Sequence, residues 1–276
     1  MKKIITTLLI TIIFAGITFA GYGEVSGEFL LMPIGPKAHA FGNSMVANTD
    51  EPLSILYNPA NSSVFSAASI SLGQTNYLYD TKLEYFSFCI PFSKNDFIGM
   101  GVNVFYTEPI DEYTWDSPLE SNRQFDVSYN SLSVNYSRKL GEKLAFGLNG
   151  KFYKEEVANI LAETFLVDFG LRYNFNENGG AGLAVQNLGP GIKFDRDVEN
   201  QEYEIPTEKL PMNILFGAEY TFIDDLKVTF QGQMVTDHPF VFSGGLEYNV
   251  LGLLPLRIGY TNQENGSLSF GMGVTY

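Results

Sequence analysis

Ser267-Leu-Ser-Phe-Gly-Met-Gly-Val-Thr-Tyr276 alternates strictly between two kinds of side chain. Large apolar residues fall on one face of an extended strand, and Ser, Thr and Gly fall on the other. A soluble sandwich strand shows the same alternation. However, this stretch matches the ~9–11 residues that a tilted strand needs to cross a bilayer, and it ends on an aromatic residue, which favours the membrane interface. The pattern predicts a membrane-spanning β-strand whose neighbours share its two faces.

The rest of the chain repeats this alternation in eleven further segments. The twelve predicted strands lie near residues 68–78, 83–91, 97–106, 124–138, 144–155, 161–175, 181–188, 211–222, 226–236, 240–250, 254–262 and 267–276. In the fourth of them the apolar alternation changes phase, which predicts a β-bulge at Asn130 and Ser131. We expect an all-β fold, an antiparallel transmembrane β-barrel in which apolar side chains face outward and small or polar ones face inward.

The lengths of the connections predict the orientation of the barrel. Short turns follow every second segment, whereas the two long connections, residues 108–123 and 189–210, both follow odd-numbered segments. In outer-membrane barrels the short turns face the periplasm and the long loops face outside. Twelve strands return the chain to its starting side, and fourteen would do so if a long loop contained a further hairpin.

The amino-terminal residues predict a signal peptide and a plug. Lys2 and Lys3 precede an apolar run that ends in small residues at Ala20, which is typical of a secretory signal peptide over residues 1–20. A membrane anchor helix is the alternative, but the run is shorter than the ~20 residues of a span. Residues 21–67 show no sustained alternation and predict a compact plug inside a barrel formed by residues 68–276.

A short helix is expected inside this plug. Asp50 is placed to cap a helix over residues 51–57, and Pro59 is placed to stop it. The helix would lead into a tight plug turn at Asn58, Pro59 and Ala60.

Composition excludes several classes of function. Charged residues make up 17% of the chain against roughly 25% in soluble domains, while aromatic residues reach 14% and there are 27 glycines, which suits a barrel wall. The net charge of −14 argues against nucleic acid as a partner. Two histidines without a ligand pattern predict no metal site, no cofactor and no enzymatic activity. The dipeptide Asp237-His238 alone is too little for a barrel protease.

Tyrosines recur just before the short turns and predict an aromatic girdle at one membrane interface. The alternative is that tyrosine simply favours strands. The expected members of this girdle are Tyr136, Tyr173, Tyr220, Tyr248 and Tyr276.

Inward positions near the same end carry charges of both signs. The expected members of this charge belt are Arg172, Glu219, Lys227, Glu247 and Arg257. Buried charges are costly unless paired, so we expect ion pairs that hold the plug, with a polar gate on a solute path as the alternative. Lys151 and Asp168 are expected higher in the lumen. The long loops are acidic, which is typical of solvated surface and less often of cation or partner contact.

The plug and several strands resemble a known family. Phe29-Leu-Leu-Met-Pro-Ile-Gly-Pro-Lys-Ala38, Tyr57-Asn-Pro-Ala60, Val185-Gln-Asn-Leu-Gly189 and Leu256-Arg-Ile-Gly-Tyr260 are similar to motifs of the PorV/PorQ family, which belongs to the superfamily of the FadL fatty-acid channel. The chain departs from the family after the plug turn, where Asn61-Ser62 replaces Gly-Leu. The resemblance implies a plugged barrel in the outer membrane of a Gram-negative-type bacterium, surrounded by outer-membrane lipid.

Three functions follow from this resemblance and the strand pattern. The first is a secretion-associated barrel of the PorV/PorQ type that binds proteins of a secretion system. The second is a FadL-like channel for hydrophobic small molecules, whose path would be shaped by the plug turn and by a wall kink at Asn187, Gly189 and Pro190. The third is a structural barrel.

Overall fold

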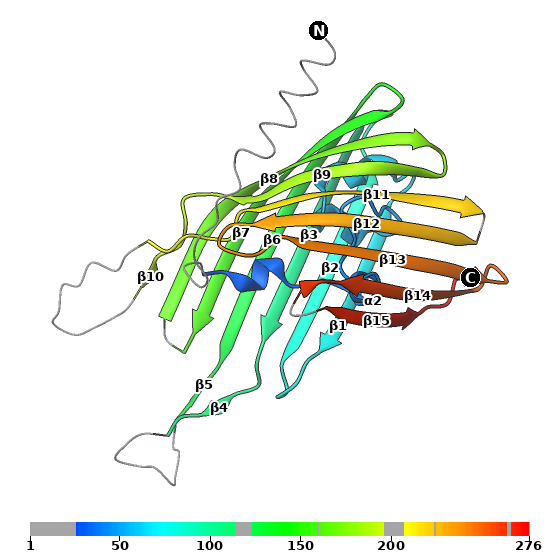
Figure 1. Ribbon diagram of the computed structural model, residues 1–276. Helices are drawn as coiled ribbons and strands as arrows, with labels where there is room; N and C mark the ends of the chain where they lie inside the picture. Colours follow the sequence, from blue (N-terminus) through cyan, green and yellow to red (C-terminus); the bar gives the residue numbers. More distant parts are fainter. Residues whose placement is uncertain are drawn as a thin grey trace.

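The computed structural model describes residues 26–113, 123–158, 160–195, 207–223, 225–263 and 266–275. They form an antiparallel sheet that curls around a core of short helices (Figure 1). The strands are β1 (Ser69–Asn76), β2 (Lys82–Pro91), β3 (Asp96–Tyr106), β4 (Ile110–Asp111), β5 (Gln124–Phe125), β6 (Val127–Leu140), β7 (Leu144–Val157), β8 (Ile160–Asn176), β9 (Gly179–Leu188), β10 (Phe194–Asp195), β11 (Asn213–Ile223), β12 (Leu226–Val235), β13 (Val241–Val250), β14 (Leu254–Thr261) and β15 (Ser267–Met272).

The predicted β-barrel fold is confirmed. Each of the twelve predicted strands is present, and each pairs with the next in the order β1-β2-β3-β6-β7-β8-β9-β11-β12-β13-β14-β15. The long connection after β3 does contain a small ladder, β4 with β5, but that ladder forms a separate sheet and adds nothing to the wall. The twelve-strand prediction therefore describes the wall, with the two-residue β10 added beside β8.

The two faces of the wall follow the alternation in the sequence. Along β8 the exposed Phe165, Val167 and Phe169 alternate with the buried Leu166 and Asp168. The predicted bulge in β6 is wrong, because β6 pairs with β3 in one continuous register through Asn130 and Ser131. The apolar phase changes there because Tyr129 points inward, into an aromatic cluster inside the lumen.

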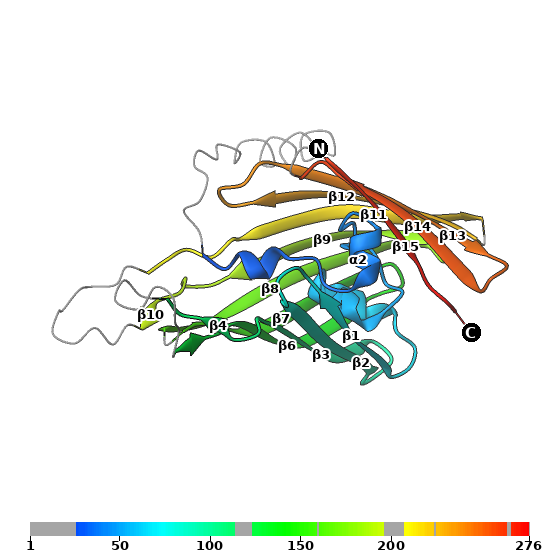
Figure 2. The same ribbon diagram turned by 90° about the horizontal axis from the view of Figure 1, so that it is seen from below.

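A plug of short helices lies in the hollow of the sheet (Figure 2). It consists of η1 (Glu28–Leu31), α2 (Pro36–Ala40), η2 (Pro52–Leu56) and η3 (Pro59–Val64). The helix expected over residues 51–57 is the 3₁₀ helix η2, and its first turn has no side-chain cap from Asp50. Pro59 ends that segment as predicted and also occupies the first turn of η3. None of the helices in the described ranges is long and apolar enough to cross a membrane.

The plug also joins the two edges of the sheet. β1 and β15 stand at opposite ends of the strand order, and the described residues contain no ladder between them. α2 packs on β14 and β15, while η2 packs on β1, β2 and β3. The plug therefore bridges the seam between the first and last strands.

Inward glycines let the plug backbone lie directly against the wall. A methyl group added at Gly147 would come within 2.3 Å of the Pro59 carbonyl carbon, and one added at Gly259 within 2.2 Å of the Gly42 nitrogen. Gly170, Gly182 and Gly245 also meet plug backbone atoms, and the glycines that meet plug side chains are Gly99, Gly101, Gly217 and Gly271. This glycine belt crosses most of the sheet and sets the depth of the plug.

The glycine belt predicts that Gly147→Val displaces the plug, because its side chain would overlap the Pro59 backbone. Gly150→Val on the same strand is the control, since a methyl group at Gly150 meets nothing within 4 Å. We expect trypsin to cleave folded Gly147→Val after Lys37 several times faster than the control, measured by mass spectrometry. Equal cleavage rates would contradict the close contact.

Candidate functional site

The plug turn is fixed by one fully buried side chain, Asn58. Its Oδ1 accepts a hydrogen bond from the Ala60 nitrogen at 3.0 Å. Its Nδ2 donates to the carbonyl oxygens of Val46, in the plug, and Leu171, in the wall, both at 3.0 Å. Asn58, Pro59 and Ala60 therefore form a turn that joins two plug segments to β8.

A set of wall amides, Asn135, Asn149, Gln186 and Gln231, satisfies the irregular plug backbone. Asn135 donates to the Pro59 carbonyl at 3.0 Å, Asn149 to Ile55 at 2.9 Å and Gln186 to Leu56 at 2.7 Å. Gln231 accepts from the nitrogens of Met45 and Val46 and donates to the Asn43 carbonyl. Unpaired backbone groups are costly when buried, so these amides stabilise the plug in place. The sequence alone assigned these amides no role.

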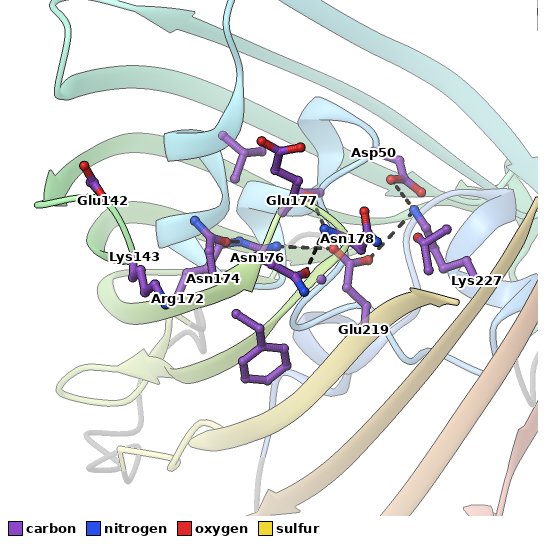
Figure 3. Close-up of a pocket in the computed structure, with 15 residues that line it drawn as sticks. Asp50, Glu142, Lys143, Arg172, Asn174, Asn176, Glu177, Asn178, Glu219 and Lys227 are labelled. Carbon is purple, nitrogen blue, oxygen red and sulfur yellow. Dashed lines mark hydrogen bonds and ion pairs between the residues drawn. The ribbon is translucent and has the colours of Figure 1, made fainter. Parts of the chain in front are cut away.

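The charge belt divides into two groups. In the first, Arg172 Nη2 lies 3.3 Å from Glu219 Oε1, and Lys227 Nζ lies 4.0 Å from Glu219 Oε2. Lys227 also pairs with Asp50 of the plug, which binds Lys37 at 2.6 Å. Figure 3 shows Arg172, Glu219, Lys227 and Asp50 around one cavity. In the second group, Arg257 Nε lies 2.6 Å from Glu247 Oε2.

Asp50 is the plug member that the sequence analysis missed, having placed it as a helix cap. Burial alone would raise the pKa of its carboxyl, but the ammonium groups of Lys37 and Lys227 outweigh burial and hold the pKa of Asp50 well below its ordinary value of 3.8. The carboxylate therefore links the plug to the wall through charge.

Lys151 and Asp168, which were expected in the upper lumen, contact Asn187 of the predicted wall kink. Lys151 Nζ lies 2.9 Å from Asp168 Oδ1 and also donates to Asn187 Oδ1. Asn187 has a left-handed backbone, with φ of 63°, and its nitrogen donates to Asp168 Oδ1 at 2.9 Å. The register between β8 and β9 shifts at this point. A methyl group at Gly189 would lie only 2.7 Å from the Phe165 carbonyl oxygen. A side chain would therefore clash there, which explains why glycine precedes Pro190. The sequence had assigned these residues to two different features, the upper lumen and the wall kink.

Four of the five predicted girdle residues lie near the short turns on the outer face. Tyr173 and Tyr248 are exposed, whereas Tyr136 is partly covered and donates to Asp96 at 2.6 Å. Tyr220 accepts a hydrogen bond from Asn176 at 3.3 Å. Tyr276 lies outside the described residues, as does the predicted signal peptide.

An aromatic cluster fills the lumen toward the long loops, and the sequence analysis did not predict it. Phe29 of η1 stacks on Tyr153 with ring centroids 6.2 Å apart, and Phe105 stacks on Tyr129 at 5.5 Å. The other buried members of this cluster are Leu83, Ala162, Leu166, Ile192 and Leu210. In the sequence, the aromatic cluster is marked by the change of apolar phase in the fourth predicted strand, because Tyr129 of that strand belongs to the cluster.

Two cavities lie at opposite ends of the lumen. The lower cavity, at the short turns, measures about 640 Å³ and is lined by the first group of the charge belt together with Asn174, Asn176 and Asn178 (Figure 3). The outer cavity, toward the long loops, measures about 650 Å³ and is bounded by η1, by the ends of β12 and β13, and by the residues after β14. The plug and the aromatic cluster lie between these two ends of the barrel.

The Asp50 contacts predict a pH dependence of plug anchoring. Because its pKa is lowered in the folded protein, Asp50 stabilises the anchored plug above pH ~3.8, and this contribution is lost as the pH falls through the folded-state pKa. Pulse proteolysis between pH 2 and 6 should show the plug of the wild type loosening at the acid end, with Asp50→Asn looser than the wild type at pH 6. Identical proteolysis of the two proteins across this range would contradict the role of Asp50.

Comparison with known proteins reveals shared architecture. No protein-family model matches the chain, and neither does any curated protein sequence. Among solved structures, the toluene transporter TodX of Pseudomonas putida is similar with a TM-score of 0.61 and 12% identity, over 93% of this chain and 89% of that one. A Pseudomonas aeruginosa FadL homologue gives a TM-score of 0.57 and 10% identity, over 88% of this chain and 81% of that one. The chain therefore has the fold of FadL-type β-barrel channels.

Proposed function

We propose that this protein is a non-enzymatic outer-membrane channel that carries hydrophobic small molecules past its plug. The apolar outer face of the wall matches the hydrocarbon core of a bilayer. The similar fold of TodX, described as a toluene transporter and a monoaromatic hydrocarbon channel, supports the solute class.

The aromatic cluster in the lumen carries this proposal. A barrel that passes water and ions has a polar interior, whereas here Phe29, Phe105, Tyr129 and Tyr153 stack inside the wall. Sites lined mainly by aromatic and apolar side chains bind apolar ligands. Solute that moves inward from the long-loop end would meet this surface before it reaches the plug turn.

Phe29 controls access to this surface in the proposed mechanism. It comes from η1, not from the wall, and it contacts the rings of Phe105, Tyr129 and Tyr153. An aromatic or aliphatic solute would take its place as η1 moves aside. The plug turn at Asn58 and the charge belt would then hold the rest of the plug, so that polar solutes remain excluded.

The second candidate is the secretion-associated barrel that the PorV/PorQ resemblance implies. It rests on the order of the sequence motifs in the plug and strands. A purely structural barrel is the third candidate. Neither of these two roles requires an apolar lumen, whereas in the channel proposal the aromatic cluster binds the solute.

Uptake by proteoliposomes tests the proposal. We expect vesicles that contain the purified chain to take up labelled toluene or a labelled fatty acid faster than empty vesicles. Phe29→Ala should raise the rate several-fold, because it removes the ring that fills the cluster. Asn58→Ala should raise it as well, because the plug turn loses its contacts with Val46 and Leu171.

Phe165→Ala is the matched control, since Phe165 is exposed on the outer face of β8 and should leave uptake unchanged. Uptake no faster than in empty vesicles for the wild type and both plug variants would remove the channel proposal and favour the secretion-associated role.

A further inference from the structure

The outer cavity has the size of a ligand site, and a largely buried amide without a hydrogen-bond partner among the described residues lines it. Its volume of about 650 Å³ falls within the ~300–1,000 Å³ of small-molecule pockets. Most of its lining residues are apolar and come from η1 and the segment after it, from β12 and β13, and from the connection between these two strands, namely Leu31, Met32, Pro33, Val235, Pro239, Phe240 and Val241. Gln233 of β12 lines the same cavity and is only 8% exposed. Within the described part of the chain its side-chain amide has no hydrogen-bond partner.

Two neighbouring amides differ from Gln233, because both have protein partners. Gln231 lies two residues away on the same face of β12, and both ends of its amide bind the plug backbone. Asn262, which also lines the cavity, accepts from the Phe242 nitrogen at 2.8 Å and donates to the Phe240 carbonyl at 3.4 Å. The Gln233 side chain lines the cavity instead, so its amide is placed to meet a polar group that arrives there.

The rim of the cavity is polar and holds η1 against the wall. His238 Nε2 lies 3.1 Å from Glu28 Oε1, and Nδ1 of the same ring donates to the Thr236 carbonyl at 2.8 Å. Glu28 belongs to η1 and His238 to the connection between β12 and β13. The carboxylate at this rim, together with the net charge of −14, disfavours an anionic ligand.

We propose that the outer cavity binds neutral apolar molecules that carry one hydroxyl or carbonyl group, which pairs with the amide of Gln233. A primary amide both donates and accepts hydrogen bonds, so either group satisfies it. A plain hydrocarbon would leave Gln233 unpaired, and a carboxylate would face Glu28. The assignment deepens the proposed function, because it names the solute class that the channel selects at its long-loop end.

Equilibrium binding to the full chain in lipid nanodiscs tests the site. The probes are labelled 1-octanol, octane and octanoate, with empty nanodiscs as the blank for partition into lipid. We expect the wild type to bind octanol about tenfold more tightly than either of the other two, the effect of one buried hydrogen bond to a neutral ligand. Gln233→Leu should lose this preference for octanol while binding octane at least as well as the wild type.

Met234→Leu is the control, because Met234 is the next side chain on the opposite face of β12. It should keep the preference of the wild type. Equal binding of octanol and octane by the wild type, tighter binding of octanoate, or an unchanged preference in Gln233→Leu would each overturn the assignment. The comparison of probes on the wild type holds even if Gln233→Leu folds poorly.

Binding and uptake separate the two proposals. Selective octanol binding without solute uptake would support the site and remove the channel. Uptake without selectivity that depends on Gln233 would support the channel and remove the site.

Discussion

The structure depends on satisfying an irregular backbone inside a barrel. Residues 43–61 form no regular ladder, yet they lie in a lumen where unpaired carbonyl and amide groups are costly. Wall amides meet these groups at fixed points, and wall glycines let the backbone come close enough for such contacts. Plug and wall therefore specify one another through these contacts.

Polarity changes along the lumen in a way that fits the proposed solute. At the short-turn end, charges of the wall pair with Asp50 and Lys37 of the plug. Toward the long loops, the same wall presents aromatic rings. In the proposed channel, an apolar molecule would thus be stabilised on the outer side of the plug and opposed by charge below it. Movement past the plug would require the backbone contacts to rearrange, not merely a side chain to rotate.

The sequence predicted the wall far better than the contents of the lumen. Period-two alternation is a local property, so all twelve strands could be found from residues that lie next to each other in the chain. Contacts such as Gln231 with Met45 join residues far apart in sequence and leave no local pattern. Tyr129 illustrates the difference, because its inward position depends on Phe29 of the plug and looked like a bulge in the strand alone. Asp50 was misplaced for the same reason, since its lysine partners lie in α2 and β12.

The seam between β1 and β15 gives the plug a part in assembly. In the described structure these two edges are linked through α2 and η2 instead of through a ladder of their own. Strand edges in lipid expose backbone groups that nothing there can satisfy. In a chain whose plug had not yet docked, the edge strands β1 and β15 would have no packing partner. The order in which plug and barrel form therefore matters. The plug helices would have to dock before the barrel closes, and the first and last strands would then come together on them.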